Sequence, residues 1–460
     1  MTEMFDFNAK VKKPLFWMMG AGVIGLLLLF LYPNNHFARL WSNLLANTYY
    51  FTGIGLFGLF AVAAGQIAYG SWQTLEKRIF LSLSGFARFG GFILLLIVGL
   101  GLANVHNLYT GVVNILHSPV TPNHTTKVIY FAPVFWLGRI FVYAILWFAF
   151  SVGMNNFFGR TDQTDPKVYK RSKLLCGAFI VVFALTESAI SWDVIMSLDP
   201  GWYSTLFGWY NFASYGCAAW AMTILLVLFL KSQGYLKQIN ENHIHDLGKL
   251  LFGFSIFWTY LWFDQFMLQW YANLPDETTF WVKRFDIGYF KITVFLTLIV
   301  NFLFPLLFLI KRSAKRNFKM IGFGAALLIL GHYVDFFNYT FVEPNWNNEV
   351  QAKRTEEVEK ANTVQLYADA EGRNVITGEL PFGKEKEEGA VKAESKKEGE
   401  AEEAPAELNY ASIGIPELLV FVGFLGIFLY LFFTNLAKRP IVPENDPYLK
   451  ENELLEVTYA

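Results

Sequence analysis

Cysteine is nearly absent from this 460-residue chain. Its two cysteines, Cys176 and Cys217, both fall in strongly apolar stretches, so we expect neither a disulfide framework nor a thiolate metal site. There is no C-x-x-C-H motif for covalent c haem, no cysteine cluster for an iron–sulfur centre and no glycine-rich phosphate loop. The predicted spans hold only His106 and His332, which argues against a b haem. The sequence therefore predicts no metal and no covalently bound cofactor.

Charged residues are also scarce, at 16%, whereas 54% of residues are hydrophobic and 18% aromatic. Several apolar runs of about 20 residues are long enough to cross a hydrocarbon core of roughly 30 Å as helices. We predict an all-α polytopic membrane protein with about ten transmembrane helices. The predicted spans cover residues 14–32, 50–70, 86–108, 130–152, 173–196, 208–230, 248–271, 286–310, 319–341 and 413–435.

The first apolar run could be read as a signal sequence. It is long for such a segment and lacks a clear small-residue cleavage site, so we expect a retained helix. Lys and Arg gather in the loops of one side, and the short loops of the other side hold only Arg39, Lys127, Lys283 and Arg284. By the positive-inside rule both termini are cytoplasmic.

A charged stretch, "GKEKEEGAVKAESKKEGEAEEAPAE", precedes the last span. It buries too little apolar surface to fold alone, so we expect residues 342–412 to be a largely disordered periplasmic segment, either a tether or a docking site. The tail after Lys438 could be a strap that docks a partner or a frayed end. The expected division is residues 1–49 with the first helix, 50–196, 208–341, 342–412, and 413–460 with the last helix.

Ionisable residues inside the predicted spans are costly and are therefore candidates for function. At 1.5 Å per residue, Glu187 lies roughly 20 Å, and Asp264, His332 and Asp335 roughly 20–24 Å, from the cytoplasmic start of their spans. All fall in the periplasmic half, whereas the cytoplasmic halves hold almost nothing titratable. Because stray charges should scatter in depth, we expect a proton-transfer belt. Its candidates are Glu187, Asp193, Asp264, His332, Asp335, Arg139 and Lys291.

Structural interpretations compete with this belt. Asp193 and His106 could sit at the wet outer ends of their helices, Lys291 could snorkel outward, and Arg139 could be the counter-ion of Glu187 or Asp264. His332 and Asp335 are three residues apart and share a helix face, whereas Glu187 and Asp193 point in directions about 240° apart. A quinol site also needs aromatic walls and a base. Its candidates are His106, Tyr260, Asp264, His332, Tyr333 and Asp335, with Trp192, Trp258 and Trp262 as further wall residues.

A faint internal repeat links the ends of two spans. One ends "SWDVIMSLDPGW" and the other "HYVDFFNYTFVEPNW", each with an Asp inside the helix and an acidic residue, Pro and Trp just beyond it. The match is weak by itself, because Pro and Trp are common at membrane interfaces. It fits two four-helix bundles that end alike.

The strings "ESAISWDVIMSLDPGWYSTLFGWY" and "WFDQFMLQWYANLPDETTFW", together with a charged excursion before the last span, resemble the NrfD-like membrane subunits of alternative complex III. This complex is a quinol:cytochrome c oxidoreductase of the bacterial inner membrane. The likeness covers residues from about 50 to 435 and is to the second, quinone-binding-type subunit of a paralogous pair. It implies two adjacent four-helix bundles plus two flanking helices.

The resemblance also implies partners and cofactors. The partners are the paralogous NrfD-like subunit, c-haem and iron–sulfur subunits, and in some complexes a terminal cytochrome oxidase. Haem and iron–sulfur clusters belong to those subunits. Quinone or menaquinone could bind this chain or only its paralogue, which is usually given the main quinol site. We expect membrane lipids, and no nucleic acid, as further partners.

Three functions follow as hypotheses. The chain could be a subunit of the redox complex that supports quinol oxidation and proton transfer toward the periplasm, without being catalytic alone. It could instead be a purely structural paralogue of the quinol-binding subunit. A secondary transporter is the third reading.

Overall fold

The computed structural model describes residues 4–31, 38–117, 125–160, 163–286, 288–343, 413–443 and 446–454. The charged segment expected at residues 342–412 lies almost wholly outside them. The helices are α1 (Ala9–Leu31), α2 (Ala38–Ile67), α3 (Lys77–Leu83), α4 (Ala87–Leu102), α5 (Thr110–His117), α6 (Thr125–Tyr130), α7 (Pro133–Arg160), α8 (Pro166–Ile190), α9 (Leu206–Ser232), α10 (Glu241–Ala272), α11 (Pro275–Asp286), α12 (Gly288–Leu298), α13 (Arg312–Arg316), α15 (Ile415–Leu436) and α16 (Leu449–Glu453). A further unlabelled helix covers Phe318–Glu343.

Two long helices change their winding along their length. α8 continues into a π-helical turn, η2 (Ser191–Ile195), and a 3₁₀ turn, η3 (Met196–Leu198), and α12 continues into the π-helical turns η4 (Ile299–Leu303) and η5 (Pro305–Leu309). A π turn inserts an extra residue and so rotates everything that follows it around the helix axis. A short 3₁₀ turn, η1 (Ser71–Gln73), precedes α3.

Nine helices among the described residues are long and apolar enough to cross a membrane. They confirm the prediction of an all-α, multi-pass membrane protein. The predicted span at 248–271 falls in α10, which has 32 residues but is not among these nine, because Trp, Tyr, Thr and Gln dilute its apolar residues.

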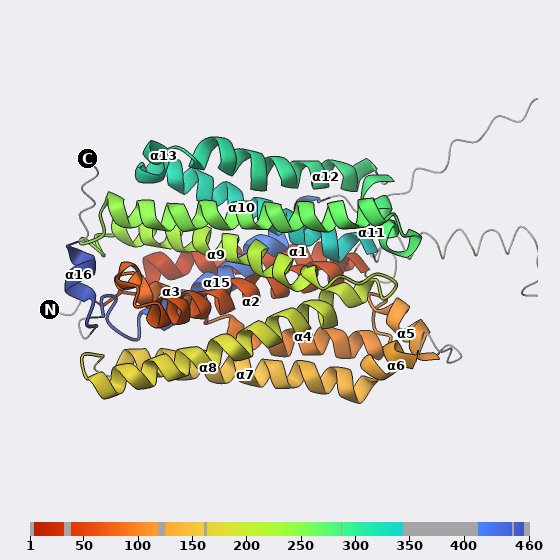
Figure 1. Cartoon of the computed structure of the whole chain (residues 1–460), viewed down its shortest axis with the longest axis horizontal. Coiled ribbons are helices and arrows are strands. Elements are labelled where there is room, and N and C mark those ends of the chain that lie inside the picture. Colours follow the sequence, from red (N-terminus) through yellow and green to blue (C-terminus); the bar gives the residue numbers. More distant parts are fainter. Residues whose placement is uncertain are drawn as a thin grey trace, which may run out of the picture. The chain divides into compact units, whose positions relative to one another are not determined.

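The start of α1 and the end of α15 indicate that α10 also crosses. Met4, just before α1, forms an isolated β-bridge with Pro440, just after α15, so these two helix ends lie on the same side of the molecule (Figure 1). An odd number of crossings would separate them. α10 runs beside α9 along the same long axis, and counting it makes the number of crossings even.

Two predicted boundaries were wrong. The second span begins at Ala38 rather than near residue 50, and the third at Lys77 rather than near residue 86. Both errors have one cause: polar residues such as Asn43, Asn47 and Arg78 were assigned to loops, yet these side chains are buried between helices.

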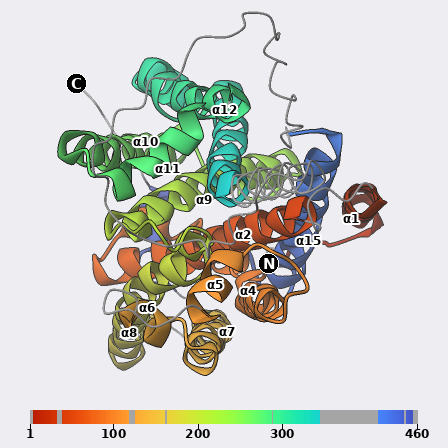
Figure 2. The same ribbon diagram turned by 90° about the vertical axis from the view of Figure 1, so that its right-hand side faces the viewer.

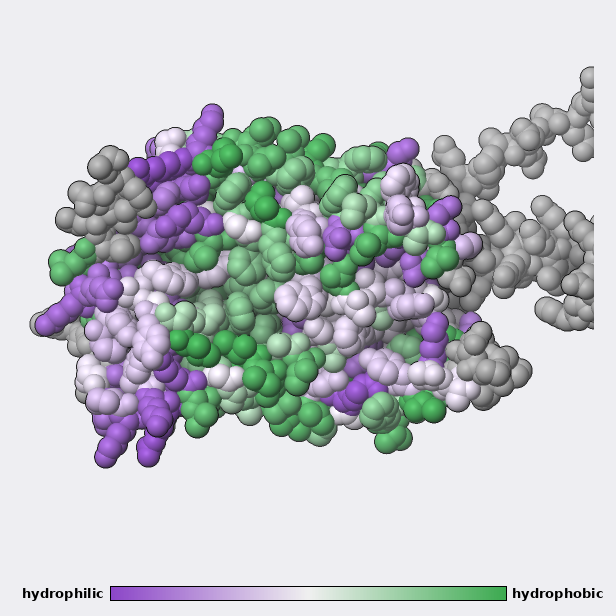
Figure 3. Space-filling model, viewed as in Figure 1, coloured by the Kyte–Doolittle hydropathy of each residue, from purple (hydrophilic) through white to green (hydrophobic). Residues whose placement is uncertain are grey.

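α2 and α9 form the centre of the molecule. α2 packs against α3, α4, α8 and α9, and α9 also packs against α10. α1 lies at the edge beside α15 (Figure 2). Figure 3 shows an apolar band between two more hydrophilic ends. We call the end with α3, α13 and α16 the basic end, and the end with α5, α6 and α11 the opposite end.

Candidate functional site

Glu187 lies near the end of α8, one turn before the π-helical turn η2, and only 5% of it is exposed. The Ser188 hydroxyl donates to one carboxylate oxygen across 3.4 Å. The Ser191 hydroxyl donates to the Glu187 backbone carbonyl across 2.9 Å and lies 3.4 Å from the other carboxylate oxygen. Both contacts with the carboxylate are long for O–H···O⁻ bonds, which are usually below 3 Å. In the part of the chain that the structure describes, no Lys, Arg or His forms an ion pair with it. Glu187 is therefore a buried carboxylate that is weakly held.

An aromatic groove of about 260 Å³ borders Glu187. Its lining residues come from α2, α8 and α9: Phe60, Ile180, Phe183, Ala184, Glu187, Ser188, Trp209 and Phe212. Trp209 is 59% exposed, so the groove reaches the apolar outer surface, where a membrane protein meets lipid. A ligand dissolved in the lipid phase could therefore enter it.

On its inner side Glu187 borders a small void of about 10 Å³, which Tyr49, Trp147 and Tyr215 also line. Tyr49 places its hydroxyl 2.7 Å from the Ser191 hydroxyl. A short chain of exchangeable protons thus leads from the groove through Glu187 and Ser191 to Tyr49. Neither Tyr49 nor Tyr215 is a candidate from the sequence alone, because a Tyr within an apolar run is typical of packing.

Asp335 lies in a different and closed site. Tyr210 and Ser214 of α9 donate to it across 2.5 and 2.8 Å, and the indole of Trp258 of α10 donates across 3.0 Å. His332 joins through the same hydroxyl, since its Nδ1 is 3.0 Å from Ser214 Oγ. The structure thus brings His332 and Asp335 together as predicted, bridged by Ser214. The Asp335 carboxylate has three donors at 3.0 Å or less and is therefore satisfied. The buried Nε2 of His332, by contrast, has no hydrogen-bond partner on a described residue.

Asp193 does not lie at the wet outer rim, and that expectation was wrong. Its side chain is fully buried, and Arg139 binds it with two parallel bonds of 2.6 and 3.2 Å. Arg139 is therefore the counter-ion of Asp193 and not of Glu187 or Asp264. The Tyr130 ring lies 4.0 Å from the guanidinium. This bidentate, stacked geometry is one that Arg favours in buried pairs.

The remaining candidates lie apart from both sites. Asp264 is half-buried and forms no ion pair with any described residue, while Tyr260 and Lys291 are exposed. His106 is buried against Trp41, its Nδ1 accepts from the Leu108 N–H at 3.3 Å, and its Nε2 lies 2.9 Å from the Ile97 carbonyl. Burial lowers the pKa of His106, opposed by that carbonyl contact. Both ring nitrogens are used, which marks a structural histidine.

Tyr333 belongs to a third polar chain. Its hydroxyl accepts from Asn47 across 3.1 Å, and Asn43, one turn earlier on α2, leads to an ion pair between Arg39 and Glu417. Tyr333 therefore faces α2 and α15 instead of Asp335. Trp258 contacts Asp335, but Trp262 packs on Phe266 and Trp281.

The repeated acidic residues meet at a cluster that sequence reasoning missed. Lys283 of α11 binds Asp199 across 2.6 Å and Glu343 across 2.7 Å, and Arg284 binds Glu343 across 3.1 Å. Burial acts against ionisation of Asp199, yet the charge and hydrogen bond of Lys283 outweigh it, and the pKa of Asp199 is lowered. The two "acidic–Pro" ends of the faint repeat therefore converge on one lysine. The faint repeat is the sequence feature that could have revealed this cluster.

The basic half also holds buried charge, so the expectation that it contains almost nothing titratable was wrong. Lys77 and Arg78 are 4% and 5% exposed. Lys77 binds Asp446 across 2.5 Å, and Arg78 donates to the Asn435 carbonyl across 2.8 Å. These charges were counted as loop residues because the third helix starts nine residues earlier than predicted.

The C-terminal tail is bound to the basic end at residues 446–454. The Asn452 side chain accepts from the Leu75 N–H and donates to the Trp72 carbonyl, both across 3.0 Å. Glu76, next to Leu75, is 1% exposed, and neither of its carboxylate oxygens has a hydrogen-bond partner on another described residue. Burial raises the pKa of Glu76 to about 8. This part of the tail is therefore a strap within the chain and not a frayed end.

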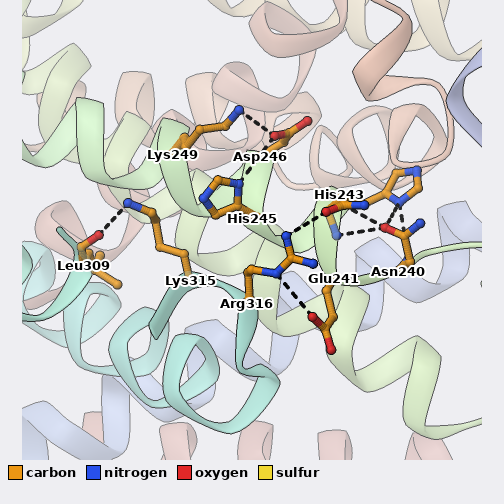
Figure 4. Close-up of polar contacts among 10 residues, drawn as sticks. Asn240, Glu241, His243, His245, Asp246, Lys249, Leu309, Lys315 and Arg316 are labelled. Atoms are coloured by element: carbon orange, nitrogen blue, oxygen red, sulfur yellow. Dashed lines mark hydrogen bonds and ion pairs between the residues drawn. The ribbon is translucent and has the colours of Figure 1, made fainter. Parts of the chain in front are cut away.

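A further ionic cluster joins the start of α10 to α13 at the basic end (Figure 4). Arg316 contacts Glu241 across 3.3 Å and donates to Asn242 across 2.9 Å. Lys249 binds Asp246 across 2.6 Å. Each pair has one well-exposed side chain, Lys249 in one and Glu241 in the other, so each adds little stability.

Comparisons with known proteins identify no family: no family model matches the chain, and no curated protein matches it. Among the described residues, no group of three or more His, Cys, Asp or Glu side chains could hold a metal ion. The candidate functional site therefore depends on its own geometry, which is that of Glu187 and its groove.

Proposed function

We propose that this chain is an integral membrane subunit of a respiratory quinol:electron-acceptor oxidoreductase of the alternative complex III type, and that Glu187 is its proton acceptor. One observation carries the proposal: a buried carboxylate that forms no ion pair with a described residue lines an aromatic groove that opens on the apolar outer surface. The proposal includes an arrangement of two adjacent four-helix bundles, placement in the bacterial inner membrane and cytoplasmic termini.

The groove has the chemistry that a quinol headgroup needs. Phe60, Phe183 and Phe212 offer ring faces and edges for a flat aromatic ring, and the long isoprenoid tail can remain in lipid. A quinol hydroxyl can donate to Glu187, which has unused acceptor capacity because its hydroxyl contacts are long.

Quinol oxidation releases two protons and two electrons. Glu187 accepts the first proton. A proton then shifts from Glu187 to Ser191 and from Ser191 to Tyr49 while Tyr49 releases its own hydroxyl proton to water or to a partner subunit, and Glu187 accepts the second. The electrons go to a c-haem or iron–sulfur centre of a partner subunit, because this sequence has no motif for either. Glu187 thus acts as a general base, while the chain by itself catalyses no complete reaction.

A structural role is the main alternative, and one observation favours it. Asp335 and Asp193 each have a full set of partners, as expected for networks that only hold helices together. A secondary transporter is the weaker alternative, although Lys77 and Arg78 supply buried charge in the basic half. Both bind the C-terminal region.

The test compares Glu187→Gln with Asp335→Asn in the intact complex. Gln keeps the size of the side chain but cannot accept a proton, so we expect quinol turnover per assembled complex to fall about 100-fold. Asp335→Asn should stay within about twofold of wild type, because its site is closed. Normal turnover in Glu187→Gln, with the assembly of the complex alone affected, would support the structural role.

A further inference from the structure

A second, larger groove of about 650 Å³ lies on another face, between α1, α9, the helix Phe318–Glu343 and α15. Its walls are apolar side chains such as Leu15, Met222, Leu226, Ala326, Phe421 and Leu425. It shares no lining residue with the groove at Glu187. A ligand in this groove would therefore not contact Glu187 or its groove.

This groove exists because α1 packs closely against α15 but leaves its other sides without close contact with a long helix. Gly22 of α1 crosses Gly423 of α15 so closely that a Cβ on Gly22 would lie 2.5 Å from the Gly423 Cα, and Gly426 contacts Met18 in the same way. This close crossing fixes α1 to α15, but its other contacts with long helices are few. A wedge remains between α1 and α9, and in a membrane a wedge of this kind must be filled by an apolar chain.

The end of the groove near the basic end of the molecule is polar. Lys10, in the first turn of α1, and Gln233, just after α9, both line it and are exposed. Neither side chain has a partner among the described residues. Lys319 adds charge nearby, since it is seven residues before Ala326 and therefore on the same face of its helix. A lone ammonium above an apolar slot matches the phosphate and acyl chain of a phospholipid.

We propose that this groove is a binding site for an anionic phospholipid. An acyl chain lies along Leu15, Leu226 and Phe421, and the phosphate sits at the Lys10 ammonium with the Gln233 amide as a second donor. The opposite charges of Lys10 and the headgroup select anionic over zwitterionic lipid. Lipid in this position joins α1 to α9 and the helix Phe318–Glu343, and so completes the packing that the glycine crossing leaves open.

The molecule provides its own control groove. A third groove, of about 600 Å³, lies between α4 and α7. Its lining residues are all apolar and include Leu96, Leu137, Gly138 and Phe141. It has a similar size but no basic or amide side chain. It should take acyl chains without regard to headgroup charge.

The experiment uses the full chain, purified in mild detergent and depleted of lipid, with added phosphatidylglycerol or phosphatidylcholine. We expect phosphatidylglycerol to raise the thermal midpoint by about 5 °C more than phosphatidylcholine does. Lys10→Gln should remove that difference, and Ala326→Trp, which fills the groove, should remove the response to phosphatidylglycerol. Gly138→Leu fills the control groove, since a Cβ there meets nothing within 4 Å, and should leave the difference intact.

Lipid that co-purifies with each variant gives a second readout, by native mass spectrometry. We expect phosphatidylglycerol on wild type and on Gly138→Leu, and at least a fivefold loss of it on Ala326→Trp. Equal responses to the two lipids in wild type would overturn the proposal, as would unchanged lipid retention in Ala326→Trp. Recovery of a quinone in place of a phospholipid, lost in Ala326→Trp, would overturn it too.

Discussion

Glu187 and Asp335 are both buried carboxylates on membrane-spanning helices, but they differ in their hydrogen bonds and in their access to a groove. Asp335 accepts three hydrogen bonds of 2.5 to 3.0 Å from two neighbouring helices. Glu187 has two hydroxyl contacts of 3.4 Å from its own helix and the Tyr215 hydroxyl of α9 as a further weak partner, and it borders a groove. Burial alone therefore does not mark a functional acid, whereas incomplete hydrogen bonding together with access does.

The largest loss of unfolding free energy should follow from removing the Asp335 carboxylate. Asp335→Leu leaves the donors of Tyr210, Ser214 and Trp258 buried without an acceptor, and we expect a loss of about 3 to 5 kcal/mol of unfolding free energy. Glu187→Leu should cost about 1 kcal/mol or less, because its contacts are long. Thermal unfolding in detergent, followed by size exclusion, measures both. Equal losses would remove the distinction between the two sites.

Glu76 adds a third kind of buried carboxyl, whose oxygens have no hydrogen-bond partner on another described residue. Its pKa of about 8 in the folded chain is above the ordinary value of 4.5. The folded state therefore holds its proton more tightly, and stability falls as pH rises between these two values. From pH 6 to 8 we expect a loss of roughly 2 to 3 kcal/mol in local stability.

Hydrogen exchange at residues 446–454, corrected for intrinsic rates, measures this loss, because the tail binds Leu75 next to Glu76. Protection of the tail should decrease from pH 6 to 8 in wild type and stay level in Glu76→Gln. The same decrease in both proteins would show that Glu76 is not the titrating group.

Narrowing the groove at Glu187 should have a smaller effect, which is on the KM for quinol. Ala184 is exposed and lines it, so Ala184→Phe should occupy the position of the quinol ring and raise KM for quinol about tenfold, which is about 1.4 kcal/mol. Val181→Phe is the matched control, since Val181 is exposed on the same helix but does not line the groove. Steady-state turnover of the intact complex measures both, and equal KM values would count against the groove.

The smallest effect should be at the exposed cluster of the basic end. The Arg316–Glu241 pair spans 3.3 Å and Glu241 has a 60% exposed side chain, so Arg316→Gln should change the unfolding free energy by about 0.5 kcal/mol or less. Lys283→Gln, in the buried cluster with Asp199 and Glu343, should cost several times more. Thermal unfolding of the two variants compares their losses of unfolding free energy. A larger loss for Arg316→Gln than for Lys283→Gln would contradict this prediction.

The membrane-spanning helices could be predicted well, because each needs a long apolar run and such runs can be recognised in a single sequence. It also placed His332 and Asp335 in one site, because a spacing of three residues defines a helix face. The partners were beyond its reach: Ser214, which bridges those two residues, and Arg139, which binds Asp193, lie on helices whose packing no local pattern fixes. The π-helical turn at Ser191–Ile195 further changes the direction of Asp193. Lys77 and Arg78 were misjudged because charge near a helix end normally indicates a loop.

The most direct test of the central claim is photolabelling of the intact complex with an azidoquinone, followed by peptide mapping. If the groove at Glu187 binds quinol, the label should appear on the helical segments around Phe183–Ser188 and Trp209–Phe212, and excess unlabelled quinol should prevent it. Labelling that leaves these segments untouched and appears only on a partner subunit, or beside Asp335, would contradict the account.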